Sequence, residues 1–155
     1  AFSLVRENFP CRLVILGEGP ERTRLEDMIR REGLADLARM PGFVRNPYQW
    51  MARASVFVLS SIYEGFGNVL VEALALGTPV VSTDCPSGPA EILANGRYGR
   101  LVPPGDPEAL AEAISSVLTS PSRRRVPSEA VRPYDVEVVT DQYLEYLGLR
   151  PAEGK

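Results

Sequence analysis

The 155-residue sequence contains no histidine and only two cysteines, and these shortages exclude several kinds of chemistry. Without histidine, the chain by itself cannot form a Ser-His-Asp or Cys-His catalytic group, and a zinc site is disfavoured. Cys11 and Cys85 lie far apart and show no metal-ligand spacing, so we expect ordinary reduced thiols. The sequence therefore predicts neither a metal nor another bound cofactor.

Long apolar segments and a large net charge are also missing. No run approaches the roughly 18 apolar residues of a membrane-spanning helix, and the N-terminus has no signal-peptide pattern. The formal net charge is -3, which gives no indication of a nucleic-acid partner. With 45% hydrophobic residues, we expect a globular, cytoplasmic protein with one buried core.

Short apolar runs alternate with helical patterns along the chain. Strands are expected within residues 11–20, 38–44, 55–61, 78–83 and 98–106. Helices are expected within residues 21–34, 46–54, 67–77, 86–96, 106–120 and 134–149, and residues 1–10 resemble the tail of another helix. Residues 121–133 contain several prolines and are expected to be irregular. This alternation predicts an α/β fold with a doubly wound parallel sheet between two layers of helices.

Four predicted strands end in small or polar residues, and ligands of such sheets bind outside the carboxyl ends of the strands. These ends are Gly17-Glu18-Gly19, Gly42-Phe43-Val44, Ser60-Ser61 and Thr83-Asp84. The third is followed by a glycine-containing loop, residues 62–67, and then by a helix. Glycine lets the backbone approach a ligand closely, and a helix N-terminus attracts negative charge. The pattern therefore favours a bound phosphate group.

Two carboxylates, Glu64 and Glu72, flank this predicted phosphate site. If the helix begins near Gly67, Glu64 lies just outside it, and Glu72 lies about 7.5 Å further along the axis. Carboxylates repel phosphate but accept hydrogen bonds from the hydroxyls of a diol. One acid on each side of a diphosphate is the pattern expected for a nucleotide sugar. The alternative is structural: Glu72 would be exposed at an edge or paired with an arginine, and side chains would fill the loop.

The segment "SSIYEGFGNVLVEALALGTPVVSTD" matches the E-x7-E signature of retaining GT-B glycosyltransferases, in particular the large GT4 family. The flanking segments resemble that family in the same order: "LVILGEGPERTRLE", "MPGFV", "SVFVLSSIYEGFG" and "PAEILANGRYGRLVPPGDPEALAEAI". Together these motifs cover about residues 12 to 118. The resemblance implies a Rossmann-like, three-layer domain that forms one half of a GT-B fold.

The resemblance also implies a role for each matching residue. Glu64 would bind hydroxyls of the donor sugar, and Glu72 would bind the ribose diol. No residue is assigned a certain catalytic role, because the family reacts with retention and without a covalent glycosyl-enzyme, so Glu64 positions the sugar. The other candidate substrate-binding residues supply mainly backbone groups to the sugar, the diphosphate and the nucleobase: Gly65, Phe66, Gly67, Asn68, Val69, Val44, Phe43 and Gly17.

The chain departs from the family in extent. Residues 1–150 resemble only the C-terminal, donor-binding domain, without its first strand, and residues 151–155 would be a tail. The N-terminal acceptor domain is absent from the chain, and so is the Arg-x4–5-Lys segment that neutralises the diphosphate. We therefore expect the chain alone to be inactive. Its donor would be a nucleoside-diphosphate sugar, with UDP as the expected nucleotide.

The resemblance leaves the pathway and the location as expectations. A hexosyl or N-acetylhexosaminyl transferase of surface polysaccharide or glycolipid synthesis is expected, in the cytoplasm and at the inner face of the membrane if its acceptor is a lipid. Arg123-Arg124-Arg125 is interpreted as a solvated turn, with contact to an anionic membrane as the alternative. Two alternatives to the transferase stay open: a GT-B relative such as a nucleotide-sugar epimerase, and a non-catalytic nucleotide-sugar binding module.

Overall fold

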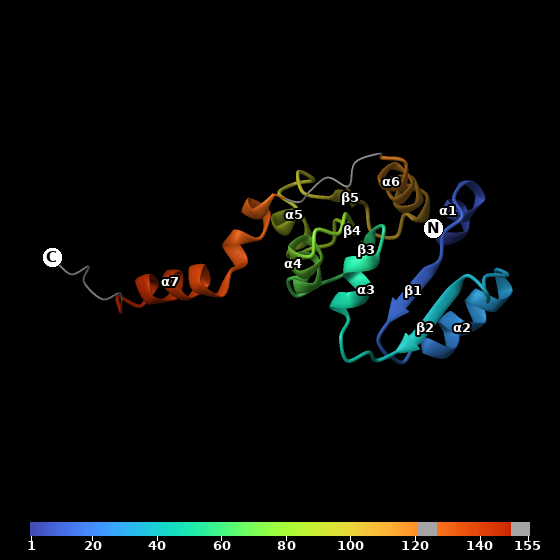
Figure 1. Cartoon of the computed structure of the whole chain (residues 1–155), viewed down its shortest axis with the longest axis horizontal. Helices are drawn as coiled ribbons and strands as arrows, with labels where there is room; N and C mark the ends of the chain where they lie inside the picture. The colour runs from blue at the N-terminus through green and yellow to red at the C-terminus, as the bar shows by residue number, and fades with distance from the viewer. Residues whose placement is uncertain (121–126, 150–155) are drawn as a thin grey trace.

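The strands and helices of the chain alternate as predicted, in a computed structural model that describes residues 1–120 and 127–149 (Figure 1). The strands are β1 (Leu13–Leu16), β2 (Ala38–Gly42), β3 (Phe57–Leu59), β4 (Val80–Thr83) and β5 (Arg100–Val102). The α-helices are α1 (Phe2–Asn8), α2 (Arg22–Arg31), α3 (Tyr48–Arg53), α4 (Asn68–Ala75), α5 (Pro89–Ile92), α6 (Pro107–Thr119) and α7 (Val136–Tyr146). Two 3-10 turns, η1 (Ser128–Ala130) and η2 (Arg132–Tyr134), precede α7.

Every strand pairing in the described chain is parallel, which confirms the predicted α/β class. The strands form two separate ladders, however: one has the order β1-β2 and the other has the order β3-β4-β5. The predicted single sheet is therefore divided between β1 and β3. Burial reflects this division, since β4 has a neighbour on both edges and is buried throughout, whereas β3 is only half-buried.

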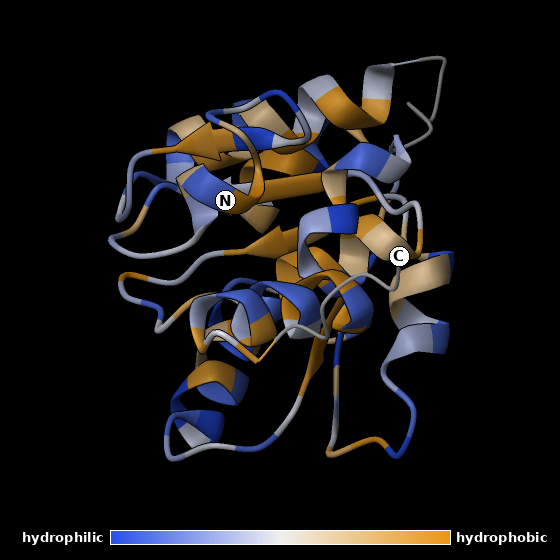
Figure 2. Cartoon of the chain, turned by 90° about the vertical axis from the view of Figure 1, so that its left-hand side faces the viewer, coloured by the Kyte–Doolittle hydropathy of each residue, from blue (hydrophilic) through white to orange (hydrophobic). Residues whose placement is uncertain are grey.

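A contact between the helices α1 and α6 connects the two ladders. α6 packs on β4 and β5, and α1, which leads into β1, packs on α6. Figure 2 shows the strands as mainly hydrophobic, whereas the helices carry both hydrophobic and hydrophilic residues, as expected for amphipathic helices on a sheet. α1 thus ties the first ladder to the second through a helix–helix contact.

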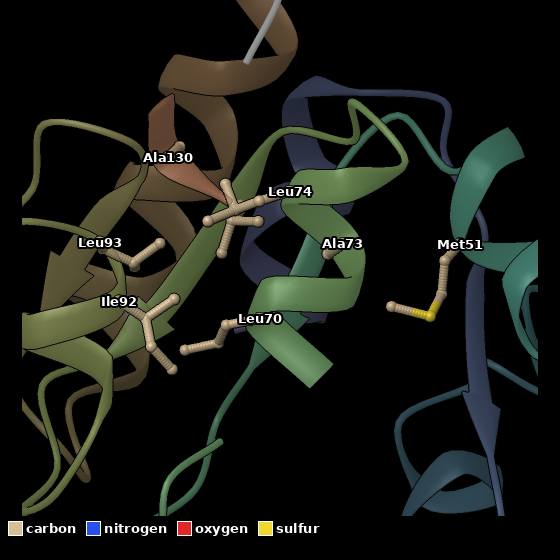
Figure 3. Packing of buried hydrophobic residues seen from close by; sticks show 8 residues of the cluster. Met51, Leu70, Ala73, Leu74, Ile92, Leu93 and Ala130 are labelled. Carbon is tan, nitrogen blue, oxygen red and sulfur yellow. The ribbon is translucent and has the colours of Figure 1, made fainter. Parts of the chain in front are cut away.

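The main core surrounds α4. Its largest buried side chains include Leu70, Leu74, Ile92 and Leu93, each at most 2% exposed. Figure 3 shows α4 between Met51 of α3 on one side and Ile92, Leu93 and Ala130 on the other. The apolar run around Glu72 in the sequence therefore belongs to a helix that packs on two of its faces.

Some predicted boundaries shift. α3 begins at Tyr48 with Pro47 as its N-cap residue, so it starts two residues into the range 46–54 that was predicted for this helix. The Asn46 side chain still accepts a hydrogen bond from the Gln49 N–H at 3.4 Å. η1 lies in the segment that was expected to be irregular, and η2 spans the boundary between that segment and the helix predicted within residues 134–149. The interpretation of Arg123-Arg124-Arg125 falls outside the described residues.

α7 projects from the rest of the protein and contacts it through η2 (Figure 1). It carries exposed apolar side chains, such as Tyr146 at 89%, beside the acids Glu137, Asp141 and Glu145. Among the helices that the structure describes, none has the length and apolar character needed to cross a membrane.

The core predicts a clear difference between two leucines of the α4 region. Leu70→Ala removes a side chain that is 0% exposed, and should lower the free energy of unfolding by about 2–5 kcal/mol. Leu76→Ala, at the end of the same helix and 37% exposed, should cost about 1 kcal/mol or less. Urea titration followed by circular dichroism measures both. Equal losses would show that α4 does not organise the core.

Candidate functional site

The predicted helix start at Gly67 is confirmed. Gly67 is the N-cap residue of α4 and has a φ of 87°, a left-handed conformation that glycine adopts without strain. The first N–H groups of a helix have no acceptor within the helix, and those of Asn68 and Val69 have none elsewhere in the described chain. Both residues are exposed. The start of α4 therefore presents free donors and the positive end of the helix dipole to solvent.

Glu64 is held in place by a short relay of hydrogen bonds from the second ladder. The Ser61 hydroxyl donates to a Glu64 carboxylate oxygen at 2.6 Å. The Thr83 hydroxyl, at the end of β4 and only 3% exposed, donates to the Ser61 carbonyl at 2.5 Å. A buried strand end thus positions the loop that carries the acid. The sequence placed Ser61 and Thr83 at strand ends but did not reveal this relay.

Glu72 lies on α4, as predicted, and is half-buried. Within residues 1–120 and 127–149, its carboxylate has no ion pair and no hydrogen bond. The structural alternative, in which an arginine neutralises Glu72, therefore has no support in the described chain. A half-buried carboxylate without a partner is suited to accept hydrogen bonds from a ligand.

The carboxyl ends of β1 and β2 lie side by side and carry three further predicted residues. The Gly17 N–H donates to the Gly42 carbonyl at 2.9 Å, so this amide of Gly17 is already used within the protein. Phe43 directly after β2 is 82% exposed, and Val44 is half-buried. An exposed aromatic ring at a strand end is available to a ligand, whereas a packing role would have buried it.

Arg22 fixes this end of the first ladder. Its guanidinium donates to Glu18 at 2.6 Å, to Glu26 at 2.9 Å and to the Met40 carbonyl at 2.9 Å. The hydrogen bond to Glu18 is the main reason why the pKa of Arg22 is raised above its usual value. A Cβ at Gly42 would collide with the Glu18 carboxylate, so the Glu18 side chain lies against the end of β2. Arg22 is thus engaged within the protein rather than presented to a ligand.

Phe66, in the middle of the glycine loop, is enclosed by two segments from later in the chain. Its ring contacts Tyr134 of η2 edge-on, with the centroids 5.8 Å apart and the planes at 62°. On its other side, a Cβ at Gly88 would overlap the Phe66 carbonyl, and Gly88 has a φ of 101°. Neither Gly88 nor Tyr134 was identified as a site residue from the sequence, because no local pattern links either to the loop.

Two hollows in the surface lie elsewhere. One of about 420 Å³ lies between β5 and α6, with Arg100 and Glu112 among its lining residues, and one of about 330 Å³ lies at Asp84 and Pro103. Neither is lined by the loop or by α4. Both hollows are therefore distinct from the surface around the start of α4.

Comparison with known proteins identifies the fold and the family. The sequence model of the family described as "Glycosyl transferases group 1" matches residues 1–120. The chain belongs to this glycosyltransferase family. The crystal structure of HepE from Anabaena in complex with UDP is similar to the chain, with a TM-score of 0.83 and 26% identity, over 95% of this chain and 44% of that one. The resemblance to a GT4-like, GT-B glycosyltransferase is therefore confirmed.

Two curated relatives illustrate the range of the family. The lipopolysaccharide core biosynthesis glycosyltransferase LpsE of Rhizobium meliloti is 35% identical over 144 residues, which is 90% of this chain and 42% of LpsE. An exopolysaccharide phosphotransferase of Streptomyces coelicolor is 45% identical over 108 residues, which is 69% of this chain and 12% of that protein. The chain spans 12% to 42% of the length of the curated relatives that it matches.

The close contact between Gly88 and Phe66 predicts that Gly88→Ala, which adds one methyl group, lowers the free energy of unfolding substantially. Gly96→Ala is a matched control, because Gly96 has a similar φ of 93° but its Cβ would lie 3.7 Å from its nearest neighbour. That control should cost about 1–2 kcal/mol through backbone strain. Gly88→Ala should cost a further 1–3 kcal/mol, roughly, through the collision with Phe66. Both are measured by urea unfolding, and an equal cost would mean that the loop moves away freely.

Proposed function

We propose that the chain is the donor-binding domain of a retaining glycosyltransferase that transfers a sugar from a nucleoside-diphosphate sugar. The observation that carries the proposal is the pair of acids on either side of the start of α4. Glu64 is oriented by Ser61, and Glu72 has no partner in the described chain. Between them, Asn68 and Val69 present free N–H groups.

Each part of a nucleotide sugar finds suitable chemistry on this face. The N–H groups of Asn68 and Val69 suit the diphosphate, because the helix dipole favours negative charge there. Glu72 suits the ribose diol and Glu64 suits the hydroxyls of the sugar, since ionised carboxylates accept from O–H donors. Phe43 and Val44 would meet the nucleobase. The role proposed here involves no metal ion and no cofactor, because the nucleotide sugar is a substrate.

The choice of UDP as the nucleotide rests on similarity. HepE from Anabaena, a structural neighbour at 26% identity, is described in complex with UDP. For this chain we propose transfer of a hexosyl or N-acetylhexosaminyl group, in surface polysaccharide or glycolipid synthesis, and a cytoplasmic location. An epimerase of related fold and a non-catalytic binding module are the alternatives, and transfer by a longer protein that includes an acceptor domain would distinguish them.

We also propose that one further parallel strand belongs between β1 and β3, as the resemblance implies. The N–H groups of Leu13 and Gly17 donate to the carbonyls of Leu37 and Gly42, on the β2 side of β1. Because successive residues of a strand point their backbone groups to opposite edges, those of Val14 and Leu16 face the other edge. Phe57 likewise bonds towards β4, which leaves the backbone of Val58 facing outward. Two unpaired edges are therefore available to a strand.

The position of α1 supports the same strand. A helix between two parallel strands is the usual crossover, and α1 leads directly into β1. Because β2 already occupies one edge of β1, a strand before α1 would take the other edge. In the resemblance, the loop after this strand supplies the cations for the diphosphate. We therefore propose that the 155-residue chain binds its donor weakly and does not catalyse transfer alone.

The role of Glu72 is tested by its removal. Glu72→Ala should weaken UDP binding by about tenfold or more, because hydrogen bonds from the ribose diol to a charged group are lost. Isothermal titration calorimetry or an NMR titration measures the affinity. Glu112→Ala, which removes an exposed acid from α6, is the matched control and should leave binding unchanged. An affinity of Glu72→Ala equal to that of the control would rule out the ribose role.

The role of Glu64 is tested by comparing two ligands. A thermal-shift screen of UDP-, GDP- and ADP-sugars first selects the donor that stabilises the chain most. Glu64→Ala should weaken binding of that nucleotide sugar by about tenfold, and binding of its bare nucleoside diphosphate by much less. The reason is that Glu64 contacts only the sugar in this proposal. Equal losses for the two ligands would contradict the assignment.

A further inference from the structure

The geometry around Phe66 points to a positioning residue outside the motifs that resemble the family. We propose that Tyr134 of η2 positions the glycine loop of the donor site by holding Phe66. This inference rests on the proposed function for its effect on ligand binding, but its structural part can be measured without a ligand. Tyr134 lies beyond residues 1–120, which are the part of the chain that the family model matches.

Three contacts surround the glycine loop. Two of them involve the backbone at Gly67 and Gly88, and the third is a contact between two side chains. A Cβ atom added to Gly67 would lie 3.6 Å from the Leu70 side chain and 3.8 Å from the Leu59 side chain, so the backbone of Gly67 packs close to the core. Gly88 lies so close to the Phe66 carbonyl that there is no room for a side chain at position 88. The third contact is the edge of the Tyr134 ring against the Phe66 ring.

Tyr134 is half-buried at the edge of the main core. Tyr134 packs against the main core cluster together with Phe66, and burial is the main reason why its pKa is raised above the usual value. The negative charge of Glu91 on α5 raises the pKa of Tyr134 further. An edge-to-face aromatic pair stabilises a contact beyond simple burial and fixes its direction.

The contact has a direct consequence for the two acids. Phe66 lies two residues after Glu64 and immediately before Gly67, the residue at which α4 begins. If Phe66 rotates away, the Glu64 side of the loop can move while Glu72 stays on its helix. Tyr134 should therefore influence binding of the sugar more than binding of the nucleotide.

Amide hydrogen exchange in the ligand-free 155-residue chain tests the positioning role. Tyr134→Leu should accelerate exchange of the Leu70 N–H, which donates to the Gly67 carbonyl at 2.9 Å, by about two- to tenfold, because the aromatic pair that holds the loop is lost. Tyr134→Phe keeps the ring and should behave like the original chain. Tyr98→Leu is the matched control, because Tyr98 packs against the same core cluster but has no ring contact with Phe66 within the described residues. Phe66→Leu should reproduce the effect, and the double variant should add nothing to it.

Calorimetry on the same variants then tests the link to function. Tyr134→Leu should weaken binding of the selected nucleotide sugar about two- to tenfold, and binding of its nucleoside diphosphate less. Faster exchange of the Leu70 N–H in a chain that binds no nucleotide would support the positioning contact and refute the proposed function. Unchanged exchange in Tyr134→Leu, or equal acceleration in Tyr98→Leu, would overturn the positioning role whether or not the chain binds its donor.

Discussion

The candidate site depends on β4, the strand that pairs along both edges. Its four residues are buried, and the last of them, Thr83, uses its hydroxyl to hold the Ser61 carbonyl after β3. Ser61 in turn orients Glu64. Because β4 is fixed by backbone hydrogen bonds to β3 and β5, this order is transmitted to a loop that has no regular structure of its own. The end of β4 therefore orients the Glu64 carboxylate through Ser61.

The sequence could reveal those features of the site that depend on local patterns. The start of α4 at Gly67 and the positions of Glu64 and Glu72 follow from local patterns, because a glycine at a positive φ and an apolar helix leave recognisable spacing. The contacts of Phe66 with Gly88 and Tyr134 could not be predicted in this way. They join residues that are distant in sequence, and their partners depend on how α5 and η2 return to the loop.

The division of the sheet is the other feature that local patterns did not reveal. The runs "LVIL" and "FVL" are apolar throughout, which is typical of strands covered on both faces and paired on both edges. In the structure each has a single partner strand, and Val14 is 39% exposed. The sequence of β1 and β3 therefore suits a more central position than the described chain provides, which agrees with the proposed additional strand between them.

The charges around the start of α4 do not balance those of a diphosphate. The face contains two carboxylates and the N-terminus of an eight-residue helix, whose dipole corresponds to about half a positive charge. Arg22, a cation beside the neighbouring strand ends, is committed to Glu18, Glu26 and Met40. A diphosphate carries more negative charge than one helix dipole can balance, and the two acids add repulsion. If this face binds a nucleotide sugar as proposed, its carboxylates suit the hydroxyls of the sugar and the ribose, and one helix dipole would leave most of the phosphate charge to be neutralised by cations.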